Sequence, residues 1–108
     1  MRTTYSQSQI TKATHITKII GDSSNLLILF ELINFGEKSF NELKRMTAIN
    51  PVTLSKKLGI LKSEGYVACK PYGIENHYFV TDKSDSLLPI IKNIENLVLI
   101  DTEVTNGR

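Results

Sequence analysis

The segment from Ser39 to Glu64 constrains the fold most, because it carries the start signals of two short helices in succession. Ser39 is followed three residues later by Glu42, the S-x-x-E capping box in which a hydroxyl and a carboxylate satisfy backbone donors at a helix start. A second start lies at Asn50, a good N-cap, with Pro51 at the first helical position, where its missing N–H costs nothing. The segment therefore predicts two helices joined by a tight turn.

The second of these helices has two unlike faces. Leucines recur with the spacing of one helix face, at Leu54, Leu58 and Leu61. The opposite face is small, polar and basic, with Val52, Ser55, Lys56, Gly59 and Ser63 at its centre and Thr53 and Lys57 on its flanks. Such a face suits the major groove of DNA, because short side chains permit close approach and lysines neutralise phosphates. An ordinary helical hairpin with a solvated lysine face is the alternative.

Positive charge is concentrated on the same part of the chain. The formal net charge of the 108 residues is only +2, which by itself does not indicate a nucleic-acid partner. The stretch from Lys38 to Lys70 holds seven basic and two acidic residues, a net charge of +5, whereas the remainder holds six basic and nine acidic residues. This asymmetry is the one that a DNA-facing surface would show, although short windows also drift by a few charges by chance.

The segments before the helical pair predict a flexible arm followed by two helices. Residues 1–9 are polar, the run from Ile10 to Ile20 has isoleucines near one side of a helix, and residues 24–35 are apolar nearly all round. The second of these helices is therefore expected at the centre of the domain. Glu37 and Lys38 are expected to form a very short strand. We predict one domain over residues 10–100 and a polar tail over residues 101–108.

A β-hairpin is predicted directly after the helical pair. Gly65 is well placed to close the second helix, residues 66–70 and 77–80 have strand composition, and residues 71–76 hold the turn formers between them. A hairpin in this position is a wing, whose tip can lie along the minor groove or the backbone. The candidate contacts are Lys70, Tyr72, Asn76 and His77. The alternative is a structural hairpin whose tip touches only solvent.

The last helix, expected from residues 81–85 to about Ile100, carries more apolar residues than one packed face of a small monomer requires. Excess apolar surface on a terminal helix indicates a partner, and we expect a homodimer through this helix with help from the first one. The predicted interface residues are Ile10, Ile16, Leu87, Ile90, Ile91, Ile94, Leu97 and Val98. The alternative is that this helix only covers its own domain.

Several motifs occur in a characteristic order. They are Leu26-Leu27-Ile28-Leu29 after Gly21, Ser39-Phe40-Asn41-Glu42-Leu43, the spaced set Leu54-Ser55, Leu58, Leu61 and Gly65-Tyr66-Val67, then Tyr78-Phe79-Val80-Thr81 and Leu88-Pro89. Together with the order of elements, they resemble the HxlR family of winged helix-turn-helix transcription regulators, within the MarR-like group, over roughly residues 20–100. The chain departs from the family pattern where Ser23-Ser24 replaces a Lys-Trp pair, where Cys69-Lys70 replaces an arginine, where Ser84 replaces a glycine, and in its shorter wing.

The resemblance implies a mainly α fold with a small β-hairpin wing, acting as a homodimer on a pseudo-palindromic DNA operator. Two recognition helices, at about residues 50–64, would then enter successive major grooves about 34 Å apart. Side chains expected at base edges or in the groove are Val52, Thr53, Ser55 and Lys56. Those expected mainly at phosphates are Lys44, Arg45, Lys57 and Lys62. Ser39 and Asn50 complete the predicted contacts, with the four wing residues.

Other classes of function find little support. The spacing of a nucleophile elbow or a phosphate-binding loop is absent, and the histidines, His15 and His77, belong to different predicted elements, so neither an enzyme nor a metal or other cofactor is expected. The single cysteine, Cys69, allows no intramolecular disulfide and could be an oxidant-sensitive thiol beside Lys70 or, more commonly, a small packed hydrophobe. No run approaches the ~18 apolar residues of a membrane span, so a cytoplasmic protein is expected.

The competing function is a winged-helix module that binds another protein instead of DNA. Its helix face would then be contacted by the side chains of a partner, and its basic excess would be incidental. Salt dependence separates the two possibilities, because each phosphate contact steepens the loss of DNA affinity with salt. The sequence indicates no operator, direction of regulation or small-molecule effector.

Overall fold

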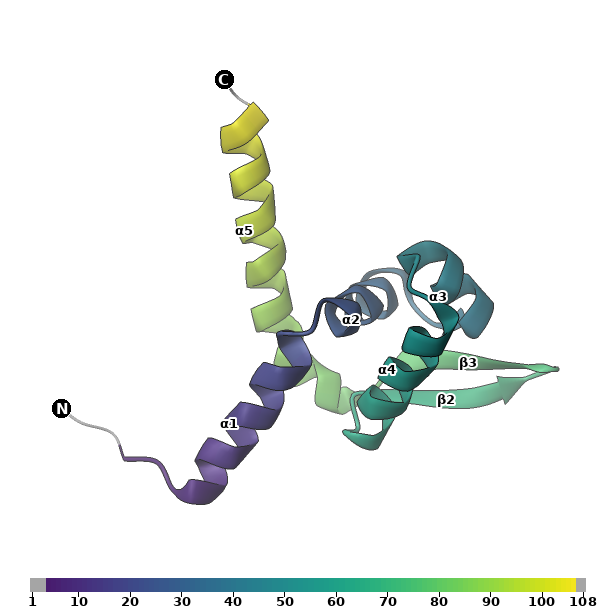
Figure 1. Ribbon diagram of the computed structural model, residues 1–108, viewed down its shortest axis with the longest axis horizontal. Coiled ribbons are helices and arrows are strands. Elements are labelled where there is room, and N and C mark those ends of the chain that lie inside the picture. The colour runs from purple at the N-terminus through teal and green to yellow at the C-terminus, as the bar shows by residue number, and fades with distance from the viewer. Residues whose placement is uncertain (1–3, 107–108) are drawn as a thin grey trace.

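The computed structural model describes residues 4–106, with side chains described as far as Leu99. Helices form most of the chain, and a small sheet packs beside them (Figure 1). The elements are α1 (Gln7–Ile20), α2 (Ser23–Phe35), β1 (Lys38–Ser39), α3 (Phe40–Thr47), α4 (Pro51–Ser63), β2 (Val67–Tyr72), β3 (Glu75–Val80), the 3₁₀ helix η1 (Asp82–Leu87) and α5 (Leu88–Asn106).

Local caps set the first two helix starts. α1 begins three residues before the predicted Ile10, because Ser6 and Gln9 form a capping box in which each side chain accepts from the other residue's backbone N–H. Residues 7–9 are therefore helical, and residues 1–3 of the predicted arm lie outside the described part. Asp22 caps α2 by accepting from the backbone N–H of Asn25 at 3.0 Å.

The core forms where α2 meets the helical pair. Ile28, Leu29 and Leu32 of α2 are buried, together with Leu43 of α3 and the three leucines of α4. The prediction that α2 is the centre of the domain is confirmed. Its full circumference is not covered, however, because Leu27 is exposed on its other side and Phe35 is exposed at its C-terminal end.

The three strands form an antiparallel sheet in the order β1-β3-β2. The hairpin is longer than predicted, since Tyr72 pairs with Glu75 across a two-residue turn. Gly73 has a φ of 66° whereas the φ of Ile74 is not positive, the pattern of a type II′ turn. Pro71 is accommodated within β2 because β2 is an edge strand, where a missing donor need not break a ladder.

The terminal helices project from this core on the side opposite the wing (Figure 1). The radius of gyration is 16.0 Å, against about 13 Å for a compact domain of this length. The predicted last helix is divided into η1 and α5, and α5 continues to Asn106, past the predicted end at Ile100. The predicted tail is thus helical over residues 101–106, and residues 107–108 lie outside the described part.

Among the helices of the described residues, none combines the length and the apolarity needed to cross a lipid bilayer. In the same part of the chain, no three His, Cys, Asp or Glu side chains are grouped in a way that could hold a metal ion.

Candidate nucleic-acid interface

The turn between α3 and α4 is fixed by caps on both sides. α3 ends at Thr47, and Ala48 adopts a left-handed conformation with a φ of 57°. The side-chain oxygen of Asn50 then accepts from the backbone N–H groups of Val52 at 2.9 Å and Thr53 at 3.4 Å. These contacts satisfy the free donors at the start of α4 and fix its direction relative to α3.

The end of α4 is closed by a Schellman motif. The N–H of Tyr66 donates to the carbonyl of Leu61 at 2.9 Å and that of Gly65 to Lys62 at 3.0 Å. Gly65 has a φ of 85°, which confirms its predicted place after the helix.

The two faces of α4 are as predicted. The three leucines are buried, whereas Val52 is 78% exposed and Ser55, Lys56, Gly59 and Ser63 are exposed beside it. A Cβ atom added at Gly59 would meet no atom within 4 Å, so this glycine is not required by packing inside the chain. Because Gly59 has no side chain, another molecule can approach the helix backbone closely at the centre of the exposed face.

Ser39 does not belong to this exposed face. Only 3% of the residue is exposed, and its hydroxyl accepts from the backbone N–H of Glu42 at 3.1 Å while the Glu42 carboxylate accepts from the Ser39 N–H at 2.9 Å. The predicted capping box is confirmed, and the predicted DNA contact by Ser39 is wrong, because the same hydroxyl is enclosed as a helix cap. The Ser39 N–H also holds the pKa of Glu42 below its usual value.

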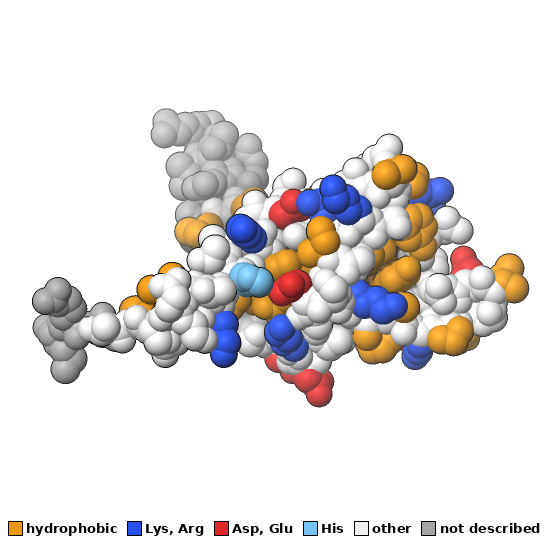
Figure 2. Space-filling model, turned by 60° about the horizontal axis from the view of Figure 1, so that its bottom comes forward, with side chains coloured by type: hydrophobic (Ala, Val, Ile, Leu, Met, Phe, Trp, Pro, Cys, Tyr) orange, Lys and Arg blue, Asp and Glu red, His pale blue; other side chains and the backbone are white. Residues whose placement is uncertain are grey.

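The basic residues around α4 differ in their exposure and in their partners. Lys44, Arg45 and Lys56 are exposed and form no ion pair with any described residue. Lys62 places its ammonium 3.3 Å from the sulfur of the half-buried Cys69. Figure 2 shows that the lysine and arginine side chains are spread across one face of the molecule and do not form one compact patch.

Lys57 is engaged inside the protein. Its ammonium lies 2.7 Å from a carboxylate oxygen of Asp22, and the two side chains are 22% and 29% exposed. The hydrogen bond from Lys57, and after it the N–H of Asn25, lowers the pKa of the Asp22 carboxyl from its ordinary value. A carboxylate of the same chain thus holds this ammonium, and we do not carry Lys57 forward among the proposed phosphate contacts.

The hairpin register sorts the wing residues onto two faces. Cys69 pairs with Tyr78 and Pro71 with Asn76, so these residues share the face that carries the Lys62–Cys69 contact with α4. Side chains alternate along a strand, which places Lys70, Tyr72 and His77 on the opposite face. The structure thus brings Asn76 to the side of α4 and does not bring the other three there.

Glu37 organises that outer face of the wing. Its two carboxylate oxygens lie 3.1 Å from the Lys70 ammonium and 2.9 Å from Nδ1 of His77. His77, followed by Lys70, lowers the pKa of Glu37, and Tyr72 stacks on the His77 ring with a centroid distance of 4.6 Å. The sequence reasoning missed Glu37, because its role depends on the pairing of β1 with β3, which no local pattern specifies.

The predicted dimer residues divide into three groups, which are buried, half-buried and exposed. Leu87 and Ile91 are 1% and 0% exposed within a single chain, so they anchor η1 and α5 to the domain core, and their prediction as interface residues is corrected. Ile16 and Ile94 are half-buried. The exposed members are Ile10, Ile90, Leu97 and Val98, and the structure adds two more exposed apolar residues, Leu99 of α5 and Tyr5 just before α1.

A model of the HxlR-like helix-turn-helix family matches residues 19–104, most of the chain. The chain belongs to this family. An uncharacterized HTH-type transcriptional regulator of Methanocaldococcus jannaschii is 36% identical over 90 residues, which cover 80% of this chain and 94% of the relative. Family membership confirms the resemblance found in the sequence, and with it a DNA-binding transcription regulator that is not an enzyme.

Solved structures of similar fold agree with this assignment. The reduced form of the redox regulator HypR has a TM-score of 0.76 at 21% identity, covering 90% of this chain and 99% of that one. The antimony-specific transcriptional repressor AntR has a TM-score of 0.71 at 18% identity, covering 99% and 91%. The transcriptional repressor BigR from Xylella fastidiosa has a TM-score of 0.70 at 25% identity, covering 82% and 87%. The mainly helical winged helix-turn-helix fold with a small antiparallel sheet is therefore confirmed.

Proposed function

We propose that this HxlR-like regulator acts as a homodimer that binds double-stranded DNA in a sequence-specific manner, with α4 in the major groove. The observation that carries the proposal is the exposed face of α4. It is uncovered along its length and lined by short side chains, while the opposite face is fully buried. The leucines on the buried face of α4 anchor it to the core, and the exposed face carries mainly short side chains, so α4 has the shape that insertion into the major groove requires.

The residues of this face have separable roles. Thr53 and Ser55 carry hydroxyls that donate to or accept from base edges, and the exposed Val52 suits a thymine methyl group. Lys56 reaches a base edge or a phosphate. The exposed Lys44 and Arg45 of α3, with Lys62 at the end of α4, supply phosphate contacts that add affinity without sequence information.

The wing contributes through the side that faces α4 and through its tip. Asn76 lies on that side, and Ile74 at the turn is fully exposed. Figure 2 shows hydrophobic side chains at the end of the molecule to which the wing extends. We assign this tip to the minor groove or backbone next to the groove that receives α4, where Asn76 can bond to polar edges and Ile74 can contact sugars.

The terminal helices supply the dimer interface. Residues 7–15 of α1 are exposed along their entire length, and Leu97 of α5 is 63% exposed. A hollow of about 810 Å³ follows α1 from Tyr5 past Ile10 and Ala13 as far as Asp22. Helices that stand this far from their own core need another surface to bury their apolar side chains, and a second copy provides it with two-fold symmetry.

The experiment that tests the proposal begins with selection of duplexes from a random-sequence library by the purified protein. Binding of the selected duplex is then compared between the wild type and the double variant Ser55→Ala, Lys56→Ala. The matched control is Ser86→Ala, Lys92→Ala, which removes the same groups from η1 and α5, away from α4. The proposal predicts a loss of at least about tenfold in affinity for the first variant and little change for the control.

Equal affinities in the wild type and the α4 variant would reject α4 as the reading helix. No binding of any duplex at low salt would contradict the proposal as a whole. That outcome would favour the alternative winged-helix module that binds another protein.

A further inference from the structure

We propose that the Asp22–Lys57 ion pair determines which operator half-site spacing the dimer accepts, by fixing α4 relative to the helix through which the two subunits join. The inference rests on the proposed function and deepens it. It assigns to Lys57 a positioning role and distinguishes it from its neighbour Lys56, which remains free for DNA.

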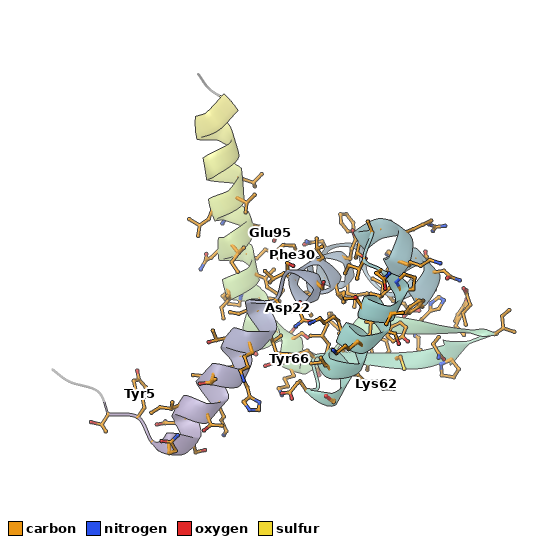
Figure 3. All side chains as sticks on the ribbon, viewed as in Figure 1. Tyr5, Asp22, Phe30, Lys62, Tyr66 and Glu95 are labelled. Atoms are coloured by element: carbon orange, nitrogen blue, oxygen red, sulfur yellow. The ribbon has the colours of Figure 1, made fainter. Side chains whose placement is uncertain are left out.

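The pair joins parts of the chain 35 residues apart with a short, partly covered contact. Asp22 uses its two carboxylate oxygens separately, one accepting from the Asn25 N–H at 3.0 Å and the other from the Lys57 ammonium at 2.7 Å. The same side chain therefore caps α2 and holds α4. Figure 3 places Asp22 at the junction of α1 and α2.

This junction is tightly bonded. The amide of Asn25, a residue that is nearly fully buried, donates to the carbonyl of Ile19 at 3.2 Å. The N–H of Gly21 donates to the carbonyl of Thr17 at 2.8 Å, and a Cβ at Gly21 would lie only 2.8 Å from that oxygen. The direction in which α1 leaves the domain is therefore fixed relative to Asp22.

The contacts form a continuous route from the proposed dimer surface to the recognition helix. The hollow along α1 ends at Gly21 and Asp22, so a partner subunit seated there reaches the base of the ion pair. The leucines behind α4 give strong but non-directional attraction, which resists separation more than small rotations or shifts. A charged hydrogen bond with fixed geometry adds the directional restraint that these leucines lack.

Small shifts of α4 matter because the two recognition helices of a dimer must match two half-sites at once. Insertion of one base pair moves a half-site by about 3.4 Å along the DNA and turns it by roughly a tenth of a helical turn. A dimer with firmly placed α4 helices discriminates against such a change, and one with loosened helices tolerates it.

Three variants isolate the pair. Asp22→Asn keeps the N-cap, because asparagine caps helices as well as aspartate, but removes the charge that holds Lys57. Lys57→Met keeps the apolar stem and removes the ammonium, and Lys57→Arg retains a cation that can reach Asp22. Lys56→Met, one position earlier on the exposed face, is the matched control.

The probes are the duplex selected by the wild type and the same duplex with one or two base pairs inserted at its centre. We expect the wild type and Lys57→Arg to prefer the selected spacing by about tenfold or more, a step of about one unit in log affinity. Asp22→Asn and Lys57→Met are expected to reduce this preference to about threefold or less. The salt slope should stay unchanged in Lys57→Met, whereas Lys56→Met should make it shallower by about 1.8, because each of the two subunits loses one phosphate contact worth about 0.9.

An undiminished spacing preference in Asp22→Asn and Lys57→Met would overturn the inference. So would a shallower salt slope in Lys57→Met, because Lys57 would then be a phosphate contact. If Asp22→Asn fails to fold, Lys57→Met decides the question. If the wild type selects no duplex at all, the proposed function itself is contradicted. If the wild type selects a duplex and the variants keep its spacing preference, only the inference about the ion pair is contradicted.

Discussion

Replacement of Ser39 by alanine should destabilise the protein while sparing its DNA contacts. The substitution removes the hydroxyl that accepts from the Glu42 N–H and leaves that donor without its partner. Loss of an N-cap of this kind costs about 0.5–2 kcal/mol. Because Ser39 is almost completely enclosed, water replaces the hydroxyl poorly, which points to the upper half of that range, about 1–2 kcal/mol.

Urea unfolding measures this cost. A small domain loses about 1–3 kcal/mol of unfolding free energy per molar urea, so the midpoint should fall by roughly 1 M. The control is Ser55→Ala, which makes the same chemical change on the exposed face of α4 and should leave the midpoint nearly unchanged while weakening DNA binding. Both variants are compared at one protein concentration, because the stability of a dimer depends on it. An unaltered midpoint for Ser39→Ala, together with a loss of DNA affinity, would refute the assignment of Ser39 as a cap.

Three further predictions test the dimer interface, the turn between α3 and α4, and the outer face of the wing. Leu97→Glu places a charge on the exposed face of α5 and should give a folded monomer on a sizing column. Leu87→Glu places the charge in the core instead and should unfold the domain. A Leu97→Glu variant that stays dimeric would contradict the proposed interface. Ala48→Gly relieves a left-handed residue and should raise the unfolding free energy by about 0.5–1 kcal/mol, measured as a higher urea midpoint; a lower midpoint would show that the turn is not strained. The lowered pKa of Glu37 means that its ionised form stabilises the fold above its ordinary value of 4.5 and that this contribution disappears as the pH falls through the folded-state pKa. The melting temperatures of the wild type and Glu37→Gln should therefore differ near neutral pH and converge in acid, and a gap that persists at low pH would exclude a charge effect.

Local signals made the helical pair predictable from the sequence. Ser39 with Glu42, and Asn50 with Pro51, are close along the chain, so the sequence alone contains both partners of each cap. The leucine periodicity likewise assigned the buried face of α4. The order of elements, on which the resemblance rested, is confirmed by the structure, and the family match confirmed the resemblance.

Contacts between distant residues could not be predicted in this way. Lys57 is on a flank of α4 in the sequence pattern, and nothing local indicates that Asp22 captures it. The faces of the wing depend on a strand register that is set by the two-residue turn at Gly73, and a shift of one residue would exchange its faces.

The dimer prediction shows a further limit. A count of apolar residues in the last helix indicated a surplus, but it could not say which ones the domain itself uses. Leu87, at the end of η1, and Ile91, four residues later in α5, are both buried in the core of their own domain. The surplus that remains for a partner lies further along α5, around Leu97.

Duplex binding at two salt concentrations, with the molecular mass of the free protein and of the complex determined in the same samples, would show whether the protein binds DNA as a dimer through phosphate contacts. A homodimeric DNA-binding regulator should give one dimer per duplex and an affinity that falls steeply with salt, by about 0.9 logarithmic units for each phosphate contact per tenfold rise in salt. A monomeric complex, or an affinity that does not respond to salt, would contradict the proposed function.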